Sequence, residues 1–263
     1  MRLLLINGNT DPAITARMVA LAHAAAGAGV AIEGATAPFG ARYVSTRSTA
    51  AIAGHAVLDA LAEALAELPP PDAVMLACFG DPGLAALREL SPVPVVGMAE
   101  ASILAAATLG GRIAVLTGGA RWVAMLTEYA AALGFGARVV VRGITPTGDA
   151  IAADPDAALP ALAAEACAAV TEDGAEVVVL GGAGLAGLAG RIADAVPVPV
   201  LDSLACTVSA AVALARAAVV KPTAGSYAAP PPVAVDGLSP ALAWLLALAT
   251  TSGGARQTRA LRS

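Results

Sequence analysis

The segment DAVMLAC at residues 72–78 decides the fold, because a second segment, EVVVLGG at residues 176–182, resembles it. Two further pairs match in the same order: RLLLINGN at 2–9 with RIAVLTGG at 112–119, and VPVVG at 93–97 with VPVLD at 198–202. All three matches recur at an offset of roughly 105–110 residues, which indicates a duplicated unit. The matched runs are rich in Val, Leu and Ile, as is typical of buried parallel strands, and helix-forming segments separate them.

This pattern predicts an α/β fold with two Rossmann-like lobes related by a pseudo-twofold axis. Each lobe is expected to hold a mostly parallel sheet flanked by helices. The first lobe would comprise residues 1–97 plus about 206–250, and the second lobe residues 98–205. Residues 251–263 carry three arginines with glycine and serine, and we interpret them as a flexible tail.

Composition narrows the class of protein. The 263 residues are 58% hydrophobic, but no apolar run approaches the roughly 20 residues of a spanning helix. The apolar N-terminus is too short for a signal peptide, so we expect a cytoplasmic protein that does not bind membranes. A net charge of −5 and an aromatic content of 3% argue against nucleic-acid binding. The three cysteines favour neither a disulfide framework nor a metal site.

Four predicted strands end in loops with small or polar residues. Ligands of parallel sheets bind beyond the carboxyl ends of the strands. If the lobes face each other, the loops converge on one cleft, with Cys78 and Gly182 on opposite sides of a ligand. The four loops are Asn7–Asn9, Cys78–Asp81, Thr117–Gly119 and Gly181–Ala183.

Cys78 lies in the segment ACFGDPGL, residues 77–84, where a strand ends and a helix begins. A thiol facing a helix N-terminus is expected to have a lowered pKa and to form a thiolate. Asp81 is expected to cap this helix, with Pro82 at its first position. The alternative interpretation is a buried structural cysteine.

Three of these segments resemble motifs of a known family. Residues 7–10, NGNT, resemble the N-P-N-T of hydantoin and allantoin racemases. Residues 77–84 resemble their first catalytic-cysteine motif, and GGAGL at 181–185 is similar to their second motif, G-C-A-G-M. To about residue 215, the chain therefore resembles the aspartate/glutamate/hydantoin racemase superfamily.

The resemblance implies proton transfer, without a cofactor, at a carbon next to a carbonyl or carboxylate. The substrate would be a small carboxylate or imide, such as an amino-acid derivative or a hydantoin. In the family, two cysteines act on opposite faces of the substrate, and Cys78 would be one of them. The other substrate-binding candidates are Asn7, Asn9, Thr10, Phe79, Gly80, Asp81, Thr117, Gly118 and Ala183.

The chain departs from the family at Gly182, which stands where the second cysteine should be. Asp81 or a water molecule would then serve the second face. Alternatively, the protein resembles the arylmalonate decarboxylases, which use one cysteine with a glycine at the other site, although their cysteine is in the second half.

A non-catalytic protein that binds a small molecule or a nucleotide is a further alternative. Residues 182–187, GAGLAG, fit G-x-G-x-x-G, and Asp202 ends the next strand, where the acid that binds the ribose of a dinucleotide would stand. The sequence leaves open whether the protein forms a homo-oligomer.

Overall fold

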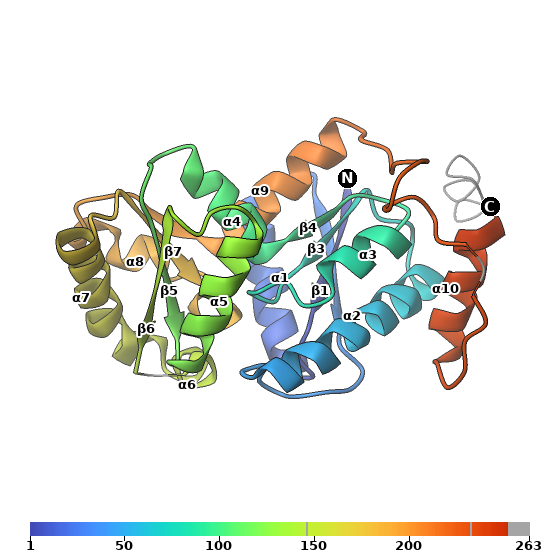
Figure 1. The fold of residues 1–263 in the computed structure, drawn as a ribbon, viewed down its shortest axis with the longest axis horizontal. Coiled ribbons are helices and arrows are strands. Elements are labelled where there is room, and N and C mark those ends of the chain that lie inside the picture. Colours follow the sequence, from blue (N-terminus) through green and yellow to red (C-terminus); the bar gives the residue numbers. More distant parts are fainter. Residues whose placement is uncertain (146, 232, 252–263) are drawn as a thin grey trace.

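The computed structural model describes residues 1–145, 147–231 and 233–251, which form two lobes, each with a four-stranded parallel sheet (Figure 1). The strand orders are β2-β1-β3-β4 and β6-β5-β7-β8, so the second sheet repeats the first. The strands are β1 (Arg2–Asn7), β2 (Ala31–Thr36), β3 (Ala73–Leu76), β4 (Val95–Gly97), β5 (Ile113–Gly118), β6 (Val139–Ile144), β7 (Val177–Gly181) and β8 (Val200–Asp202). The predicted α/β class with two related lobes is confirmed.

Strand register also repeats between the lobes. Leu3 pairs with Ala73 in the first sheet, and their counterparts Ile113 and Val177 pair in the second. The central strands β3 and β7 are buried along their whole length. A strand covered on both faces needs apolar side chains at every position, which explains the uninterrupted runs in the sequence.

Helices cover both sheets, and several begin at residues suited to that position. Asp11 caps α1 through the backbone N–H of Ala13, and Thr46 forms a capping box with Thr49 at the start of α2. The helices are α1 (Pro12–Ala26), α2 (Arg47–Glu67), α3 (Leu84–Leu90), α4 (Met98–Ala107), α5 (Arg121–Ala132), α6 (Gly148–Ala153), α7 (Pro155–Asp173), α8 (Ala189–Ile192), α9 (Ser203–Arg216) and α10 (Pro240–Thr251), with 3-10 turns η1 (Ala183–Leu185) and η2 (Ala193–Ala195).

After the second lobe the chain returns to the first. Helix α9 packs on α1, α4 and β3, and α10 packs on α2, at the far end from the second lobe (Figure 1). Ser239 caps α10 at Leu242 and donates a hydrogen bond to the buried Asp59 of α2. This packing supports the lobe boundaries, which remain a prediction. Beyond Thr251 the predicted tail lies outside the described residues.

Within the described ranges, α2 alone is long and apolar enough to cross a membrane by length and composition, with a mean hydropathy of 1.3. Half of that window is buried in the lobe, where α2 packs on β1, β2 and α10. Such burial is typical of a core helix.

Candidate active site

A cavity of about 280 Å³ lies between the lobes, at the carboxyl ends of the central strands. Seven of the residues singled out from the sequence line it: Asn9, Cys78, Phe79, Thr117, Gly118, Gly182 and Ala183. Asn7, Thr10, Gly80 and Asp81 do not line it. The folding of the two halves therefore brings Cys78 and Gly182 to one cavity from different lobes, while the functional roles of these residues remain predictions.

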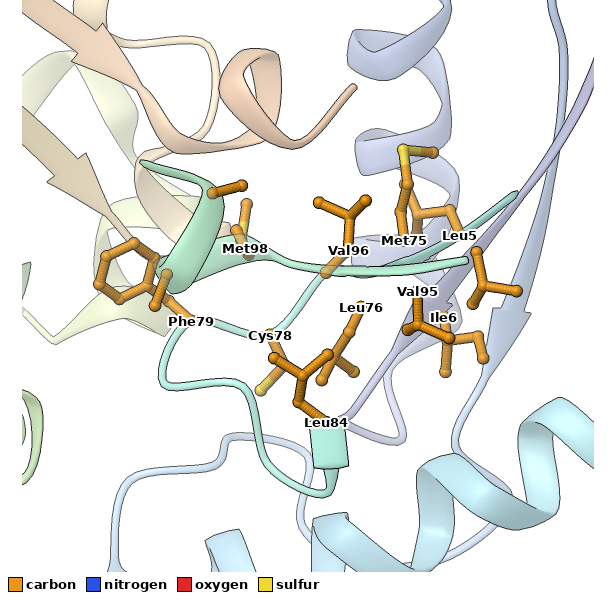
Figure 2. Close-up of a cluster of buried hydrophobic side chains, with 14 of the residues drawn as sticks. Leu5, Ile6, Met75, Leu76, Cys78, Phe79, Leu84, Val95, Val96 and Met98 are labelled. Atoms are coloured by element: carbon orange, nitrogen blue, oxygen red, sulfur yellow. The ribbon is translucent and has the colours of Figure 1, made fainter. Parts of the chain in front are cut away.

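Cys78 lies two residues after Leu76, where β3 ends, and is 8% exposed at the edge of the first-lobe core. Figure 2 shows its side chain beside Leu76 and Leu84, with Phe79 turned away from it. An ideal Cβ on Gly8 would lie 3.2 Å from the Cys78 Sγ. A side chain at position 8 would therefore crowd the Cys78 thiol, and glycine at this position leaves room for it.

The expected thiolate is not supported. Burial raises the pKa of the Cys78 thiol to about 12, and the nearby charge of Asp81 contributes to the increase. The apolar surroundings outweigh the short helix α3, which begins six residues later at Leu84. Cys78 is accordingly a neutral thiol near pH 7, a form suited to donating a proton.

Asp81 does not have its expected role either. Helix α3 begins after Gly83, with no side-chain cap. The Asp81 carboxylate instead accepts hydrogen bonds from the backbone N–H groups of Ala99 (3.0 Å) and Glu100 (2.8 Å), at the start of α4. Because this carboxylate is buried outside the cavity, it is not placed to serve the second face of a substrate.

Asn7 and Asn9 form a pair in which one side chain orients the other. The Asn9 Oδ1 accepts hydrogen bonds from Asn7 Nδ2 (3.0 Å) and from the backbone N–H of Asp11 (2.9 Å). This arrangement leaves the Asn9 Nδ2 as a donor without a partner among the described residues, on a side chain that lines the cavity. Asn7 is fully buried and supports Asn9 rather than lining the cavity.

Gly182 has backbone angles φ 134° and ψ 149°, which residues with a side chain rarely adopt. The space beside it is open, since an ideal Cβ would lie 3.6 Å from the nearest side-chain atom, on Leu185. A cysteine here would therefore have room but would need a different backbone. On the same strand end, Gly181 allows the Phe79 ring of the first lobe to pack against it.

A further set of cavity residues, on the segment 37–46 and on the second lobe, was not predicted from the sequence. Tyr43 of the first lobe reaches across, and its hydroxyl accepts a hydrogen bond from the Gly148 N–H (3.1 Å). Trp122 of α5 donates from Nε1 to the Val44 carbonyl (3.1 Å). Although aromatic residues make up 3% of the chain, Tyr43, Phe79 and Trp122 all line the cavity.

The glycine-rich segment 182–187 lacks the context of a dinucleotide site. It contains the three-residue turn η1 and is followed by the four-residue α8, not by a long helix whose N-terminus could hold a pyrophosphate. Asp202 accepts hydrogen bonds from the N–H groups of Gly187 and Ala205, so both carboxylate oxygens are engaged.

Two parallel-sheet lobes with a single thiol at their shared cavity define a class of two-lobed α/β enzyme. The chain matches the model of the family Asp/Glu/Hydantoin racemase over residues 3–211, and it belongs to that family. It is 35% identical over 212 residues to a hydantoin racemase of Paenarthrobacter aurescens, covering 80% of this chain and 89% of the relative. The crystal structure of allantoin racemase from Pseudomonas fluorescens superimposes with a TM-score of 0.85 at 35% identity, covering 90% of this chain and 100% of that one. The expected racemase-type enzyme is thus confirmed at the level of the family.

The fold also extends to enzymes of other chemistry. An unliganded arylmalonate decarboxylase matches with a TM-score of 0.54 at 20% identity, covering 81% of this chain and 92% of that one. This likeness shows a shared fold.

Proposed function

We propose that this protein catalyses cofactor-independent proton transfer at a carbon next to a carbonyl, in a hydantoin-like imide or an amino-acid derivative. The observation that carries the proposal is the position of Cys78, which meets the Gly182 loop of the other lobe across one cavity. Asn9 would donate from Nδ2 to a substrate oxygen and stabilise the negative charge that develops there. The neutral Cys78 thiol would deliver a proton to the adjacent carbon. Three unpaired cysteines fit the cytoplasmic location that we also propose.

Asp149 is our proposed acceptor for the proton on the second face. It lines the cavity from the first turn of α6, in the same lobe as Gly182. The other carboxylate that lines the cavity, Asp11, is held by Arg42 and by its own helix cap. Asp149 has no hydrogen-bond partner among the described residues. It would take the α-proton as Cys78 gives its own. Water at the cavity mouth would then take the proton from Asp149 and return one to the Cys78 thiolate, so that both groups are restored.

Replacing Asp149 with asparagine is expected to lower kcat for α-proton exchange by about 10²-fold, since the amide cannot accept the proton. The measurement is deuterium incorporation from deuterated water into the accepted substrate. Asp154→Asn is the matched control, because Asp154 caps α7 outside the cavity and asparagine caps equally well. Equal rates for the two variants would rule out Asp149 as the acceptor.

The substrate is to be found by a screen of hydantoins, amino acids and substituted malonates in deuterated water. A racemase exchanges the α-proton and abolishes optical rotation. If no compound in the screen exchanges a proton or loses carbon dioxide, the proposed function is wrong.

Decarboxylation of a malonate-like acid is the second candidate. Two observations favour it: the Gly182 backbone disfavours a second cysteine, and burial raises the pKa of Cys78 to about 12 and so keeps its proton available. In this reaction the carboxylate leaves as carbon dioxide, and Cys78 protonates one face of the enediolate. Carbon dioxide release with a product of one hand would distinguish this reaction from racemisation.

A further inference from the structure

The turn that carries Cys78 has an unusual backbone. Gly80 and Gly83 have φ of 97° and 78°, and between them Asp81 has φ of 50°, one of two positive values at described non-glycine residues. A positive φ is strained for a residue with a side chain, so it persists where surrounding contacts hold the backbone in place. The Asp81 N–H donates to the Cys78 carbonyl (3.0 Å), so the position of Asp81 and that of Cys78 are linked directly.

The contacts that hold this turn come from helices α4 and α5 and from Gly97 at the end of β4. Tyr129 of α5 donates a hydrogen bond from its hydroxyl to the Asp81 Oδ2 (2.7 Å). Trp122, also of α5, packs against Gly80, where an ideal Cβ would lie 2.8 Å from the indole ring. Gly97 leaves room for the carboxylate, since a Cβ there would lie 2.5 Å from Asp81 Oδ2. Helix α5 therefore anchors the turn at two consecutive residues.

The charged and titratable groups around Asp81 are few. Glu100 of α4 lies beside it but pairs with Arg88 of α3 through both carboxylate oxygens. Burial raises the pKa of the Asp81 carboxyl to about 6, although hydrogen bonds from Tyr129 and from the α4 backbone lower it. Asp81 is therefore mostly ionised near pH 7, and its negative charge adds to the effect of burial on the pKa of the Cys78 thiol.

We propose that Asp81 is a positioning residue that fixes the Cys78 turn against the second lobe through Tyr129. The inference deepens the proposed function and rests on it, because it names the residue that holds the proposed proton donor in place. It connects the lobe interface to the chemistry, since α5 of one lobe holds the thiol of the other.

The test is alkylation of Cys78 by iodoacetamide at pH 8.5, followed by mass spectrometry of the peptide that contains it. Asp81→Asn removes the charge, so the thiolate fraction should rise and alkylation should become up to about tenfold faster. Asp202→Asn is the control, since Asp202 also caps a helix but does not contribute to the pKa of Cys78. An Asp81→Asn rate no higher than that of wild type would show that neither the position nor the thiolate fraction of Cys78 depends on the Asp81 carboxylate, which overturns the proposal.

Tyr129→Phe separates charge from accessibility, because it removes the anchoring hydroxyl and keeps the carboxylate. Its alkylation rate should stay within about twofold of wild type, whereas amide hydrogen exchange of residues 81, 83 and 84 should become about tenfold faster. Unchanged amide exchange in Tyr129→Phe overturns the positioning role. This test does not depend on whether the Asp81→Asn variant folds. An alkylation rate as high as that of Asp81→Asn shows that exposure, not charge, controls the thiol. Neither readout needs a substrate, so failure here is distinct from failure of the proposed function.

Discussion

Replacing Cys78 with serine is expected to lower kcat/KM for the accepted substrate by about 10²–10⁴-fold, the contribution typical of a positioned acid or base. A serine hydroxyl is a much weaker acid than a thiol, so it cannot supply the proton even in the same position. Fold and cavity should be retained, because oxygen is smaller than sulfur and Gly8 leaves space for either. The measurement is the initial rate of deuterium exchange, or of carbon dioxide release, for wild type and variant.

Cys206→Ser provides the matched control for this experiment. Cys206 is a partly buried thiol on α9, and it does not line the cavity. Its replacement should leave kcat/KM within about twofold of wild type, as for substitutions away from a site. A Cys78→Ser enzyme with full activity would show that Cys78 is a structural cysteine.

Replacing Gly184 with alanine is expected to destabilise the protein by about 3 kcal/mol and to disrupt the cavity. An ideal Cβ on Gly184 would lie 2.0 Å from the Gly148 carbonyl oxygen, and backbone atoms cannot yield as a flexible side chain would. The start of α6 would have to move, and with it Asp149 and the hydrogen bond between Gly148 and Tyr43. Thermal unfolding should show a lower Tm, and activity should fall with it.

Gly190→Ala controls for the general effect of adding a methyl group to this glycine-rich segment. Gly190 lies in α8, has no atom within 4 Å of its ideal Cβ and does not line the cavity. Alanine is favoured over glycine in a helix, so the Tm should be unchanged or slightly higher. If Gly184→Ala is as stable as Gly190→Ala, the close contact with α6 is not required.

The glycines illustrate how sequence and structure contribute differently. A pattern search marks residues 182–187 as a nucleotide motif, because spacing is all that a sequence displays. In the structure, Gly182 is needed for its positive φ and Gly184 for the approach of Gly148, neither of which involves a nucleotide. The same residues thus have a packing explanation that only the neighbouring segment reveals.

Asp81 and Tyr43 show why part of the site was not predictable. Asp81 stands at a position where a local cap was expected, but its partners Ala99, Glu100 and Tyr129 are 18 to 48 residues away in the chain. Tyr43 meets Gly148, 105 residues later. Local rules describe contacts within a turn or two, so they do not detect such partners.

The sequence by itself determined the duplicated parallel sheets and the placement of Cys78 and Gly182 at matching strand ends, because strand period and repeat offset are properties of the chain alone. The tertiary structure decided that Cys78 keeps its proton and that Asp81 is turned away from the cavity. It also decided that aromatic side chains line the cavity. The physical reason is that pKa, hydrogen-bond partners and cavity shape depend on desolvation and on atoms contributed by distant segments, which are fixed only when the lobes meet.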